Sequence, residues 1–449
     1  MNKTLGIWGF GVVGISALRF FSRRQWHIQV MDNRQLSTEQ QSLVNQVNAT
    51  FIDQTPESIE QFFTANAYIL ASPGIDLRPY AQYKHKFLTE LDLFGKACVQ
   101  PIVAITGSVG KTTVTHLLST LLTAQGMHTF TGGNIGTGML DMIDHQVYYD
   151  CAVIEVSSFQ LEYCKTFAPD LAIITNVYPN HLDRHGTLEN YFTAKYQVAA
   201  HQGIGQQSLI PFEFRAQLPV TETVRNYFTH LPITDEQCAS LSAREALFYY
   251  TDSHIMKYHN GSHTPVITRA ELPTISFELN WLILCAALTI LRVPLQVIAQ
   301  LPDENTLPEH RLELVATIAG ATFYNDSKST LAQSTLAAID RLKGKSIILF
   351  LGGVSKGVSR ETLIQALPSD VQEVYCFGAE ADQLHRWCVK YNKVAYAFTT
   401  LDDAFSTVTK KLAPQMCILF SPAGTSYDLF AHYEERGNYF KKLVTTILV

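Results

Sequence analysis

Residues 103–115, VAITGSVGKTTVT, carry the feature that most constrains how this chain can fold. An apolar run leads into Gly107 and Gly110, and Lys-Thr-Thr follows. Glycines let backbone N–H groups turn inward, where they and the next helix N-terminus can hold phosphate oxygens. The Lys111 amine can reach the β- and γ-phosphates of a nucleotide, and the Thr112 hydroxyl can ligate Mg²⁺. The segment predicts a strand, a phosphate-binding loop and a helix. The alternative is a plain tight turn between a buried strand and a helix.

Length, charge and hydropathy limit the class of protein. A chain of 449 residues is too long for one core, and a prior of about 150 residues per domain favours three domains. The net charge of −6 gives no electrostatic footprint for nucleic acid. We find no signal peptide, and the most apolar helical candidate, 281–291, is too short to cross a bilayer. We therefore expect a cytoplasmic monomer with no nucleic-acid or membrane partner.

The cysteines are scattered along the chain. There are 8 of them and none forms a C-x-x-C pair. In a chain of this size that pattern predicts buried thiols, not a disulfide framework or a zinc site.

Strand–helix alternation runs through the whole chain and predicts three α/β domains with largely parallel sheets. We place a Rossmann-like domain at 1–96, a P-loop ATPase domain at 97–300 and a second Rossmann-like domain at 301–449. The later part of the central region, 205–270, is more polar, and its strands are harder to place.

The first domain opens with a glycine turn. Gly9-x-Gly11-x-x-Gly14 follows a predicted strand, and Asp32 ends the next strand. Such a turn lets a pyrophosphate approach a helix N-terminus and is used for NAD, FAD and UDP-sugars. A plain βαβ turn is the alternative. The P-loop domain that follows argues against hydride chemistry and favours a UDP-linked substrate.

Three ionisable residues stand out in the central region. Glu155 ends an apolar strand, which places a carboxylate beside the phosphate loop, where it can hold Mg²⁺ or its waters. His181 follows the next strand and can ligate a metal through a neutral imidazole. Lys195 lies on a predicted helix. Taken singly, these residues also fit a strand-end carboxylate, a solvated loop histidine and a surface lysine.

Three segments of the last region follow predicted strands. They contain Asp326-Ser327-Lys328, Lys356 after a glycine pair, and Ser426 near the predicted start of a helix. Charged and hydroxyl groups there suit a polyphosphate, a developing anion and a carboxylate. Each segment also fits a surface turn. Because the carboxyl ends of parallel strands share one edge, together they predict a shared site.

At this point the chain resembles the Mur ligase family over essentially its whole length. A phosphate loop with only two residues between its glycines is typical of that superfamily, which includes folylpolyglutamate synthetases. The last matching segment is similar to that of the members that add D-glutamate. The segments that carry the resemblance are GFGVVGIS, ASPGI, TGSVGKTT, GGNIG, EVSSFQLE, NHLDRH, YFTAKY, HRLE, NDSKST, LGGVSKG and SPAGTSYDLF…ERG.

The resemblance implies an ATP-dependent amide ligase that adds D-glutamate to UDP-N-acetylmuramoyl-L-alanine through an acyl phosphate, in peptidoglycan precursor synthesis. It implies ATP and two Mg²⁺ ions. It assigns ATP to Gly107, Ser108, Gly110, Lys111, Thr112, Thr113, Asn280, Arg311, Asp326 and Lys328. It assigns the UDP substrate to Val12, Val13, Asp32, Asn33, Ser72, Gly74, Asn134, Ser157 and Ser158. It assigns D-glutamate to Lys356, Ser426, Tyr427 and Tyr433. It makes Lys111, Glu155, His181 and Lys195 catalytic, and Thr112, Glu155, His181 and a carbamylated Lys195 metal ligands.

The chain also departs from the family pattern. Val109 replaces an Asn of the phosphate loop, Asn180 replaces the Asp before the metal histidine, Ser276-Phe277 replace a His-Asn pair near the adenine, and Val354-Ser355 replace an Asp-Gly. We expect an active enzyme with an altered adenine pocket and weaker affinity for ATP. Tyr427 and Tyr433 are larger or more polar than expected, so amino-acid specificity can differ.

The alternatives fall into different classes. One is a related ligase that adds another amino acid, for instance to a folate-like acceptor. A second is a decayed ligase that binds a nucleotide sugar without turnover. A dehydrogenase would rest on the Gly9–Gly14 turn and Asp32 alone.

Overall fold

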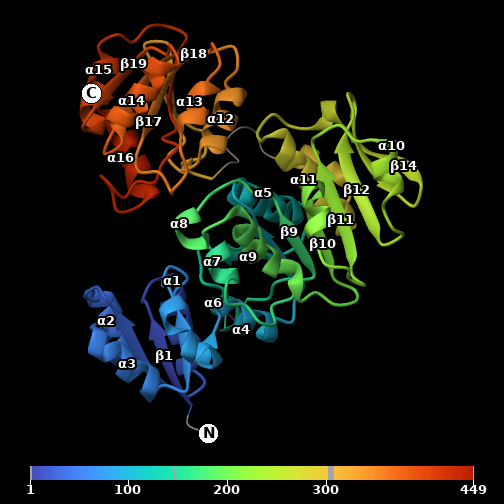
Figure 1. Cartoon of the computed structure of the whole chain (residues 1–449), viewed down its shortest axis with the longest axis vertical. Coiled ribbons are helices and arrows are strands. Elements are labelled where there is room, and N and C mark those ends of the chain that lie inside the picture. Colours follow the sequence, from blue (N-terminus) through green and yellow to red (C-terminus); the bar gives the residue numbers. More distant parts are fainter. Residues whose placement is uncertain (1–2, 145–146, 302–307, 448–449) are drawn as a thin grey trace. The chain divides into compact units, whose positions relative to one another are not determined.

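The computed structural model describes residues 3–144, 147–301 and 308–447. It contains three α/β parts, each built on its own sheet, which Figure 1 colours blue, cyan to yellow, and orange to red. Each sheet lies within one of the three predicted domains, which confirms the fold class. By packing, the chain forms two compact units: Met1–Asn176, Phe192–Pro273 and Leu279–Leu301 make the first, and Val177–Tyr191, Thr274–Glu278 and Pro302–Val449 make the second.

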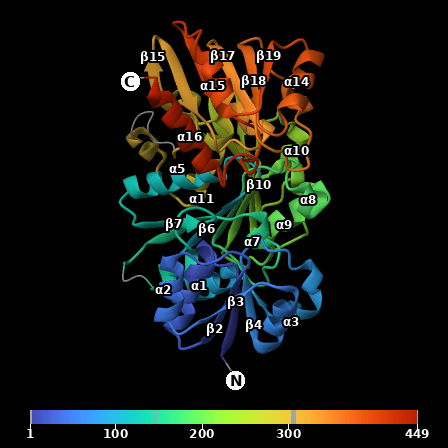
Figure 2. The same cartoon turned by 90° about the vertical axis from the view of Figure 1, so that its left-hand side faces the viewer.

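The N-terminal part is a fully parallel sheet in the order β3-β2-β1-β4-β5. The strand order reverses between β1 and β4, and a ligand crevice forms beyond the strand ends at such a point. Figure 2 shows β2 and β4 between α2 and α3. The elements are β1 (Thr4–Trp8), α1 (Val12–Ser22), β2 (His27–Asp32), α2 (Thr38–Gln46), β3 (Thr50–Asp53), α3 (Pro56–Ala65), β4 (Tyr68–Ala71), η1 (Arg78–Lys86), β5 (Phe87–Leu88) and α4 (Glu90–Ala97).

The central sheet has the order β14-β13-β12-β11-β10-β9-β6-β8-β7. β6, β8 and β9 are buried along their whole length, as expected for parallel strands covered on both faces. The elements are β6 (Ile102–Thr106), α5 (Lys111–Ala124), β7 (Thr129–Gly133), α6 (Met139–Asp144), β8 (Cys151–Glu155), α7 (Ser158–Leu161), β9 (Leu171–Ile174), α8 (Leu182–His185), α9 (Leu188–Ala200), β10 (Gln207–Pro211), η2 (Phe212–Gln217), β11 (Val224–Thr229), α10 (Asp235–Ala239), β12 (Glu245–Tyr250), β13 (His254–His259), β14 (Ser262–Thr268), η3 (Arg269–Glu271), α11 (Glu278–Ile290) and η4 (Leu295–Gln300).

One edge of this sheet departs from the parallel pattern. β13 pairs antiparallel with β12 and with β14, so the polar region contains a hairpin. β14 is the edge strand and carries Pro265 opposite Met256, next to a shift in register. Because this hairpin is half exposed, its residues lack the continuous apolar runs that mark the buried strands.

The C-terminal sheet has the order β15-β16-β20-β17-β18-β19, parallel except for the β15–β16 hairpin. Apolar clusters cover both of its faces, one with Leu349 and Leu419, the other with Phe350 and Phe420. The elements are β15 (Glu313–Ile318), β16 (Ala321–Asn325), α12 (Ala332–Arg341), β17 (Ser346–Gly352), α13 (Glu361–Gln365), β18 (Val371–Phe377), α14 (Ala381–Lys390), β19 (Ala395–Phe398), α15 (Leu401–Thr409), β20 (Met416–Phe420) and α16 (Tyr433–Thr446).

Two sequence expectations concern thiols and membranes. All eight cysteines are free, and all are buried except the half-buried Cys98, as predicted. Among the described residues, no helix has both the length and the apolar character needed to cross a bilayer.

Two carboxyl groups of α4 contact other elements of the first unit, and their pKa values shift in opposite directions. Glu90 is buried and accepts a hydrogen bond from the Met139 N–H at 3.0 Å, while its Oε2 has no partner in the described residues. Burial raises the pKa of Glu90 from 4.5 to about 7. Burial would also raise the pKa of Asp92, but hydrogen bonds from Thr166, Thr89 and Lys165 outweigh it and hold that pKa below its usual range.

This contrast gives a pH-dependent prediction. The folded chain keeps a proton on Glu90 that the unfolded chain loses above pH 4.5, so its contribution to stability is full at low pH and is lost as pH rises through 7. Between pH 5 and pH 8, the free energy of unfolding of Glu90→Gln should therefore rise by about 2–3 kcal/mol relative to that of the parent.

Asp92→Asn is the matched control with the opposite sign. The depressed pKa means that Asp92 stabilises the fold above the unfolded value and loses that effect as pH falls. This variant should melt lower than the parent at pH 8. Thermal melts of all three proteins at both pH values test the pair, and a Glu90→Gln difference that does not change with pH would contradict it.

Candidate active site

The phosphate loop connects β6 to α5 and is held by backbone and amide hydrogen bonds. Asn176 accepts from the Ser108 N–H through its carbonyl at 3.0 Å and from the Val109 N–H through Oδ1 at 2.9 Å. The Val109 carbonyl in turn accepts from Thr175 Oγ1 at 2.7 Å and from Asn176 Nδ2 at 2.9 Å. The end of β9 therefore fixes the loop.

Both loop glycines are required by this packing. Gly107 has φ +148° and Gly110 has φ +85°, in the region that favours glycine. A Cβ on Gly107 would collide with Thr175 Oγ1, and one on Gly110 would lie 2.7 Å from Asn280 Oδ1. Asn280, from α11, thus borders the phosphate loop. Its predicted role in binding ATP stays a prediction.

Two predicted catalytic lysines meet at one carbonyl oxygen. Lys111 Nζ and Lys195 Nζ each donate to the Gly107 carbonyl at 2.8 Å. Lys195, on α9, is 1 % exposed, so the view of it as a surface lysine is wrong. The site therefore holds two ammonium groups beside the loop, an arrangement that suits a polyphosphate or another anion.

The third catalytic candidate, Glu155, lies at the end of β8 beside β6. Thr112 Oγ1 donates to Glu155 Oε2 at 2.7 Å, and Asn134 Nδ2 donates to Oε1 at 2.8 Å. Glu155 is 2 % exposed, so the view of it as a surface strand-end residue is wrong. The sheet order β6-β8-β7 brings these three residues to one edge, as the carboxyl ends of parallel strands require.

The oxygen donors of this group fit magnesium. Mg²⁺ is usually bound by one or two carboxylates together with substrate phosphates and water. A carboxylate and a hydroxyl within hydrogen-bond distance supply such donors. In the described part of the chain no cluster of three or more His, Cys, Asp or Glu side chains is placed to hold a metal ion.

His181 belongs to the second unit, in the segment Val177–Tyr191. It adopts φ +53° immediately before α8. Its neighbour Asn180 is 4 % exposed, and the Asn180 Oδ1 accepts no hydrogen bond from the described residues. A buried oxygen without a donor can bind a cation or a water molecule on that cation. The metal role of this segment stays a prediction.

The predicted UDP-substrate residues gather at the carboxyl ends of β1, β2 and β4. Asp32 accepts the Phe10 N–H at 2.7 Å and hydrogen bonds from the Arg34 N–H and side chain. Burial alone would raise its pKa, but these bonds hold the pKa of Asp32 below its usual range. Ser72 Oγ donates to the Gly9 carbonyl at 3.0 Å. Two loops are thereby tied across the point where the strand order reverses.

The remaining residues of this set surround that point or lie on the central sheet. Val12, Asn33 and Gly74 are exposed and Val13 is half-buried. Ser157 caps α7, and Ser158, its first residue, is buried. The exposed members are available to a ligand, and their contacts to the UDP substrate stay predictions.

The three segments of the C-terminal domain also meet at one sheet edge. Asp326, Lys356 and Ser426 follow β16, β17 and β20, which are neighbours in the sheet. Val354 and Thr425 form a β-bridge, and Lys356 Nζ donates to Thr330 Oγ1 at 3.2 Å. The three segments therefore converge, as the strand positions predicted.

Asp326 is more deeply buried than a surface turn would allow. It accepts from Ser421 Oγ at 2.7 Å and from the Leu312 N–H at 3.1 Å. Burial raises its pKa, while the charge of Arg311 and these hydrogen bonds oppose the rise. The Arg311 Nε has no partner in the described residues. Lys328 lies 5.1 Å from the centre of the Tyr433 ring.

The expected position of Ser426 near a helix start is wrong. α16 begins at Tyr433, and Ser426 lies earlier, in a turn whose Leu429 and Phe430 N–H groups donate to its carbonyl. Ser426 is buried, whereas Tyr427 is 75 % exposed. The chain between β20 and α16 thus contains a turn, and the sequence pattern did not predict that this turn ends before the helix begins.

Sequence reasoning missed the residue that joins these loops. Arg436 is fully buried in α16 and donates to Ser327 Oγ at 3.1 Å, to the Ser327 carbonyl at 2.7 Å and to the Gly424 carbonyl at 3.0 Å. Burial lowers its pKa to about 10, so it stays charged at neutral pH. The only signal was the ERG triplet of the last matching segment, which carries no hint of its partners.

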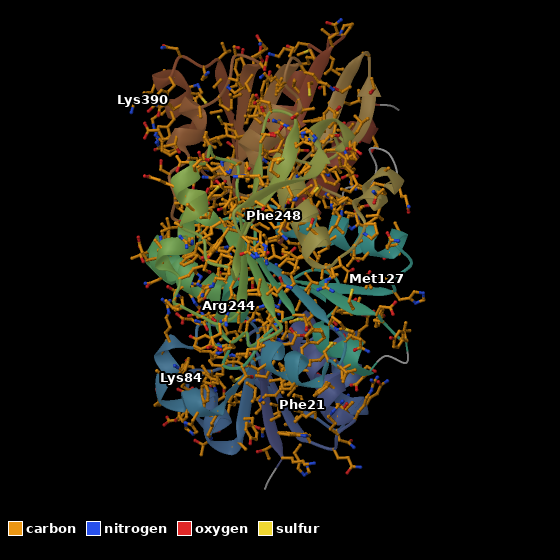
Figure 3. The ribbon with its side chains drawn as sticks, turned by 90° about the vertical axis from the view of Figure 1, so that its right-hand side faces the viewer. Phe21, Lys84, Met127, Arg244, Phe248 and Lys390 are labelled. Atoms are coloured by element: carbon orange, nitrogen blue, oxygen red, sulfur yellow. The ribbon has the colours of Figure 1, made fainter. Side chains whose placement is uncertain are left out.

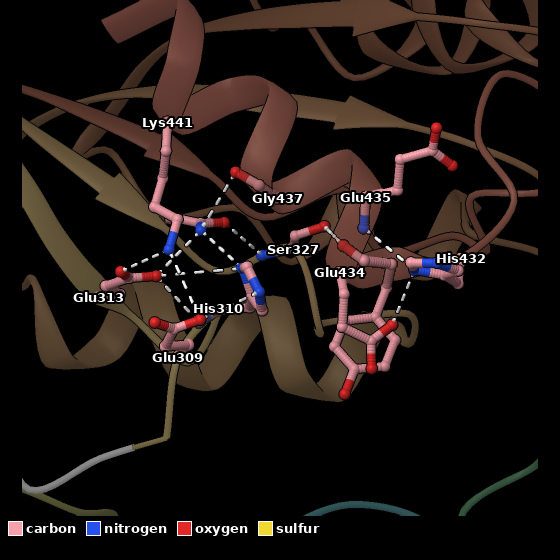
Figure 4. A network of polar contacts seen from close by, with 11 residues as sticks. Glu309, His310, Glu313, Ser327, His432, Glu434, Glu435, Gly437 and Lys441 are labelled. Carbon is pink, nitrogen blue, oxygen red and sulfur yellow. Dashed lines mark hydrogen bonds and ion pairs between the residues drawn. The ribbon is translucent and has the colours of Figure 1, made fainter. Parts of the chain in front are cut away.

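A polar network extends this joint toward β15 (Figure 4). Lys441 forms ion pairs with Glu313 and Glu309, and the His310 N–H donates to Glu313. Ser327 Oγ donates to the Tyr433 carbonyl at 2.8 Å. Burial and the charge of Lys441 lower the pKa of His310, which favours its neutral form. The network fixes the start of α16 against the loop that carries Asp326.

Comparison with known proteins agrees with this architecture. The Mur ligase MurD-like N-terminal domain matches residues 3–84, the Mur ligase middle domain residues 105–265, and the Mur ligase glutamate ligase domain residues 310–424. The UDP-N-acetylmuramoylalanine–D-glutamate ligase of Desulfotalea psychrophila is 32 % identical, over 99 % of this chain and 96 % of that protein. The ligase of the same name from Oleidesulfovibrio alaskensis is 33 % identical, over 86 % and 81 %.

Solved structures share the fold. The UDP-N-acetylmuramate–alanine ligase MurC of Thermotoga maritima gives a TM-score of 0.58 at 15 % identity and covers 99 % of both chains. MurF ligase of the same organism, in complex with ADP, gives 0.57 at 14 % identity over 94 % of this chain and 95 % of that one. The chain belongs to the Mur ligase family of ATP-dependent amide ligases, as its motifs predicted.

The close approach at Gly107 generates a prediction. Gly107→Ala should weaken binding of a non-hydrolysable ATP analogue about 5- to 150-fold, because the added methyl group strains the loop by about 1–3 kcal/mol. Titration calorimetry measures the affinity. Gly203→Ala is the control, since a Cβ there meets nothing within 4 Å. Equal affinities for both variants would contradict the role of this contact.

Arg436 generates a second prediction. Arg436→Met leaves two carbonyls and a hydroxyl without their donor, which costs about 1–3 kcal/mol for each unsatisfied group. Amide hydrogen exchange should accelerate at least about tenfold at residues 326–328 and 424–426. Arg386→Gln removes an exposed arginine of α14 and should leave these amides unchanged. Unaltered protection in Arg436→Met would contradict the role of Arg436.

Proposed function

We propose that the chain catalyses the ATP-dependent addition of D-glutamate to UDP-N-acetylmuramoyl-L-alanine, in the synthesis of peptidoglycan precursors. The carrying observation is the identity with ligases of that name along nearly the whole chain. The contacts among Lys111, Thr112, Glu155 and Lys195 support it, because they gather phosphate- and cation-binding groups at one strand edge.

The chemistry follows from charge. The substrate carboxylate attacks the γ-phosphorus of ATP, and the bond from the γ-phosphorus to the bridging oxygen breaks. ADP departs, and the substrate becomes an acyl phosphate. The Lys111 ammonium and the loop N–H groups stabilise the negative charge on the transferring group. The amine of D-glutamate then attacks the acyl carbon, loses a proton and displaces phosphate, which leaves an amide.

Magnesium is part of the proposal, as two ions held by Thr112, Glu155, His181 and a carbamylated Lys195. When bound, Mg²⁺ offsets charge on the phosphates and supplies Lewis-acid polarisation. Carbamylation turns Lys195 from a cation into an anion and so changes its partner from the Gly107 carbonyl to a cation.

The other assignments follow the same pattern. UDP-substrate groups meet the β1, β2 and β4 ends, and D-glutamate meets Lys356, Ser426, Tyr427 and Tyr433. We further propose that the protein acts in the cytoplasm as a monomer, without nucleic-acid or membrane partners. Val109 stands where the family pattern has a polar Asn, but the loop hydrogen bonds described above use only the backbone of this residue. That supports activity despite this departure.

Phosphate release tests the proposal. With ATP and Mg²⁺, release should require both UDP-N-acetylmuramoyl-L-alanine and D-glutamate, and a panel of other amino acids should give little. Glu155→Gln keeps the shape of the side chain but removes its charge and should lower kcat about 100-fold or more. Glu60→Gln, on the exposed face of α3, should match the parent.

The possible outcomes separate the alternatives. Release with another amino acid would point to a ligase of different specificity. Binding of the UDP substrate without release would point to a decayed binding protein. Reduction of NAD or oxidation of NADH by the protein would be needed to support the dehydrogenase alternative.

A further inference from the structure

A cavity of about 710 Å³ lies beside β11 in the central domain, and none of the residues assigned above to ATP, the UDP substrate or D-glutamate lines it. Its size is within the range of small-molecule sites, roughly 300–1,000 Å³. Figure 3 labels Arg244, one of its lining residues, on the green part of the ribbon. The proposed reaction gives this cavity no role.

The cavity is built on one face of a strand. Arg225, Tyr227 and Thr229 alternate along β11 and all line it, as residues two apart on a strand must share a face. The chain before β11 and the chain after it supply the walls. Their apolar members include Leu218, Val220 and Ile233.

One arginine of the cavity is fully neutralised. Arg215 Nε and Nη2 donate to the Glu245 carboxylate at 3.0 and 2.9 Å, and its remaining contacts go to Ser240. Tyr227 Oη donates to the same carboxylate at 2.9 Å. Arg215 and Glu245 therefore form a closed ion pair in the wall.

Arg225 is different. It is 7 % exposed, its Nη2 donates to Tyr196 Oη at 3.1 Å and to the Pro219 carbonyl at 2.5 Å, and its guanidinium also interacts with the Tyr227 hydroxyl. Within residues 3–144, 147–301 and 308–447, no carboxylate lies within ion-pair distance of it. A buried charge is costly unless an opposite charge meets it, so this guanidinium lacks the partner that its burial calls for.

The other charged residues that line the cavity are Arg244 and Glu213, so three arginines and two glutamates give the lining a net charge of +1. Arg244 donates to the Glu222 carbonyl at 3.2 Å and forms no ion pair in the described chain. Glu213 accepts a hydrogen bond from Thr229. The hydroxyls of Thr221, Thr223 and Ser242 also line the cavity and can donate to an oxyanion.

We propose that this cavity binds a small organic anion. Its carboxylate or phosphate meets Arg225, whose planar fork suits two parallel hydrogen bonds, and its apolar body packs against Leu218, Val220 and Ile233. Binding is reversible and non-covalent.

Ligand-observed ¹⁹F NMR tests the site with 4-fluorobenzoate, and 4-fluorobenzamide serves as the uncharged probe of the same shape. Competition with phenyl phosphate and with inorganic phosphate distinguishes a carboxylate from a phosphate ligand and shows whether an apolar body is needed. Four variants complete the set: Arg225→Met removes the charge, Arg225→Lys keeps it, Ala216→Trp fills the cavity from its exposed wall, and Arg386→Gln removes a surface charge that does not line the cavity.

The parent and Arg386→Gln should bind 4-fluorobenzoate saturably and equally. Arg225→Met and Ala216→Trp should each weaken binding about tenfold or more, and Arg225→Lys, which keeps the charge but loses the planar fork, should bind more weakly than the parent and more tightly than Arg225→Met. The benzamide should bind at least about tenfold more weakly than the benzoate.

Equal binding of acid and amide, equal binding by parent and Arg225→Met, or no saturable binding of any anionic probe would overturn the proposal. Since Ala216→Trp alters volume and not charge, it decides the matter if Arg225→Met fails to fold. Binding is read without turnover, so this result does not depend on the ligase proposal.

Discussion

The short distance between Gly107 and Thr175 sets the geometry of the phosphate loop and of the groups around it in the central domain. It presses the phosphate loop against the end of β9 and leaves the Gly107 carbonyl facing two lysine amines. Thr112 then starts α5 at the place where its hydroxyl reaches Glu155 on the next strand. Any residue larger than glycine would move the loop, and with it the lysines and the helix N-terminus. The site is thus a consequence of strand spacing as much as of its named side chains.

Much of the fold was predictable because buried parallel strands are continuous apolar runs followed by glycine turns. The strand before the phosphate loop and the strand that Glu155 ends form where the sequence predicts them, at 102–106 and 151–155. The β13–β14 hairpin was not predictable, since half-exposed antiparallel strands lack such runs. Arg436 was missed for another reason: its partners Ser327 and Gly424 are distant in sequence, and only folding shows that a guanidinium spans them.

The departures from the family pattern fall in places with different tolerance. Val109 lies where Asn176 and Thr175 bind backbone atoms, so the loop keeps its hydrogen bonds. Asn180 is buried with an oxygen that no described donor reaches. Ser276 and Phe277 directly precede α11, whose Asn280 borders the phosphate loop. The first change is therefore mild by geometry, whereas the others alter groups that a ligand or cation can meet.

Pro265 gives the central sheet a property unrelated to catalysis. It stands in β14, the edge strand, and has no N–H to offer a further strand. An exposed edge otherwise invites pairing between molecules, which proteins prevent with proline and irregular register. The proline and the irregular register of the hairpin therefore disfavour the pairing of a further strand at this edge of the nine-stranded sheet.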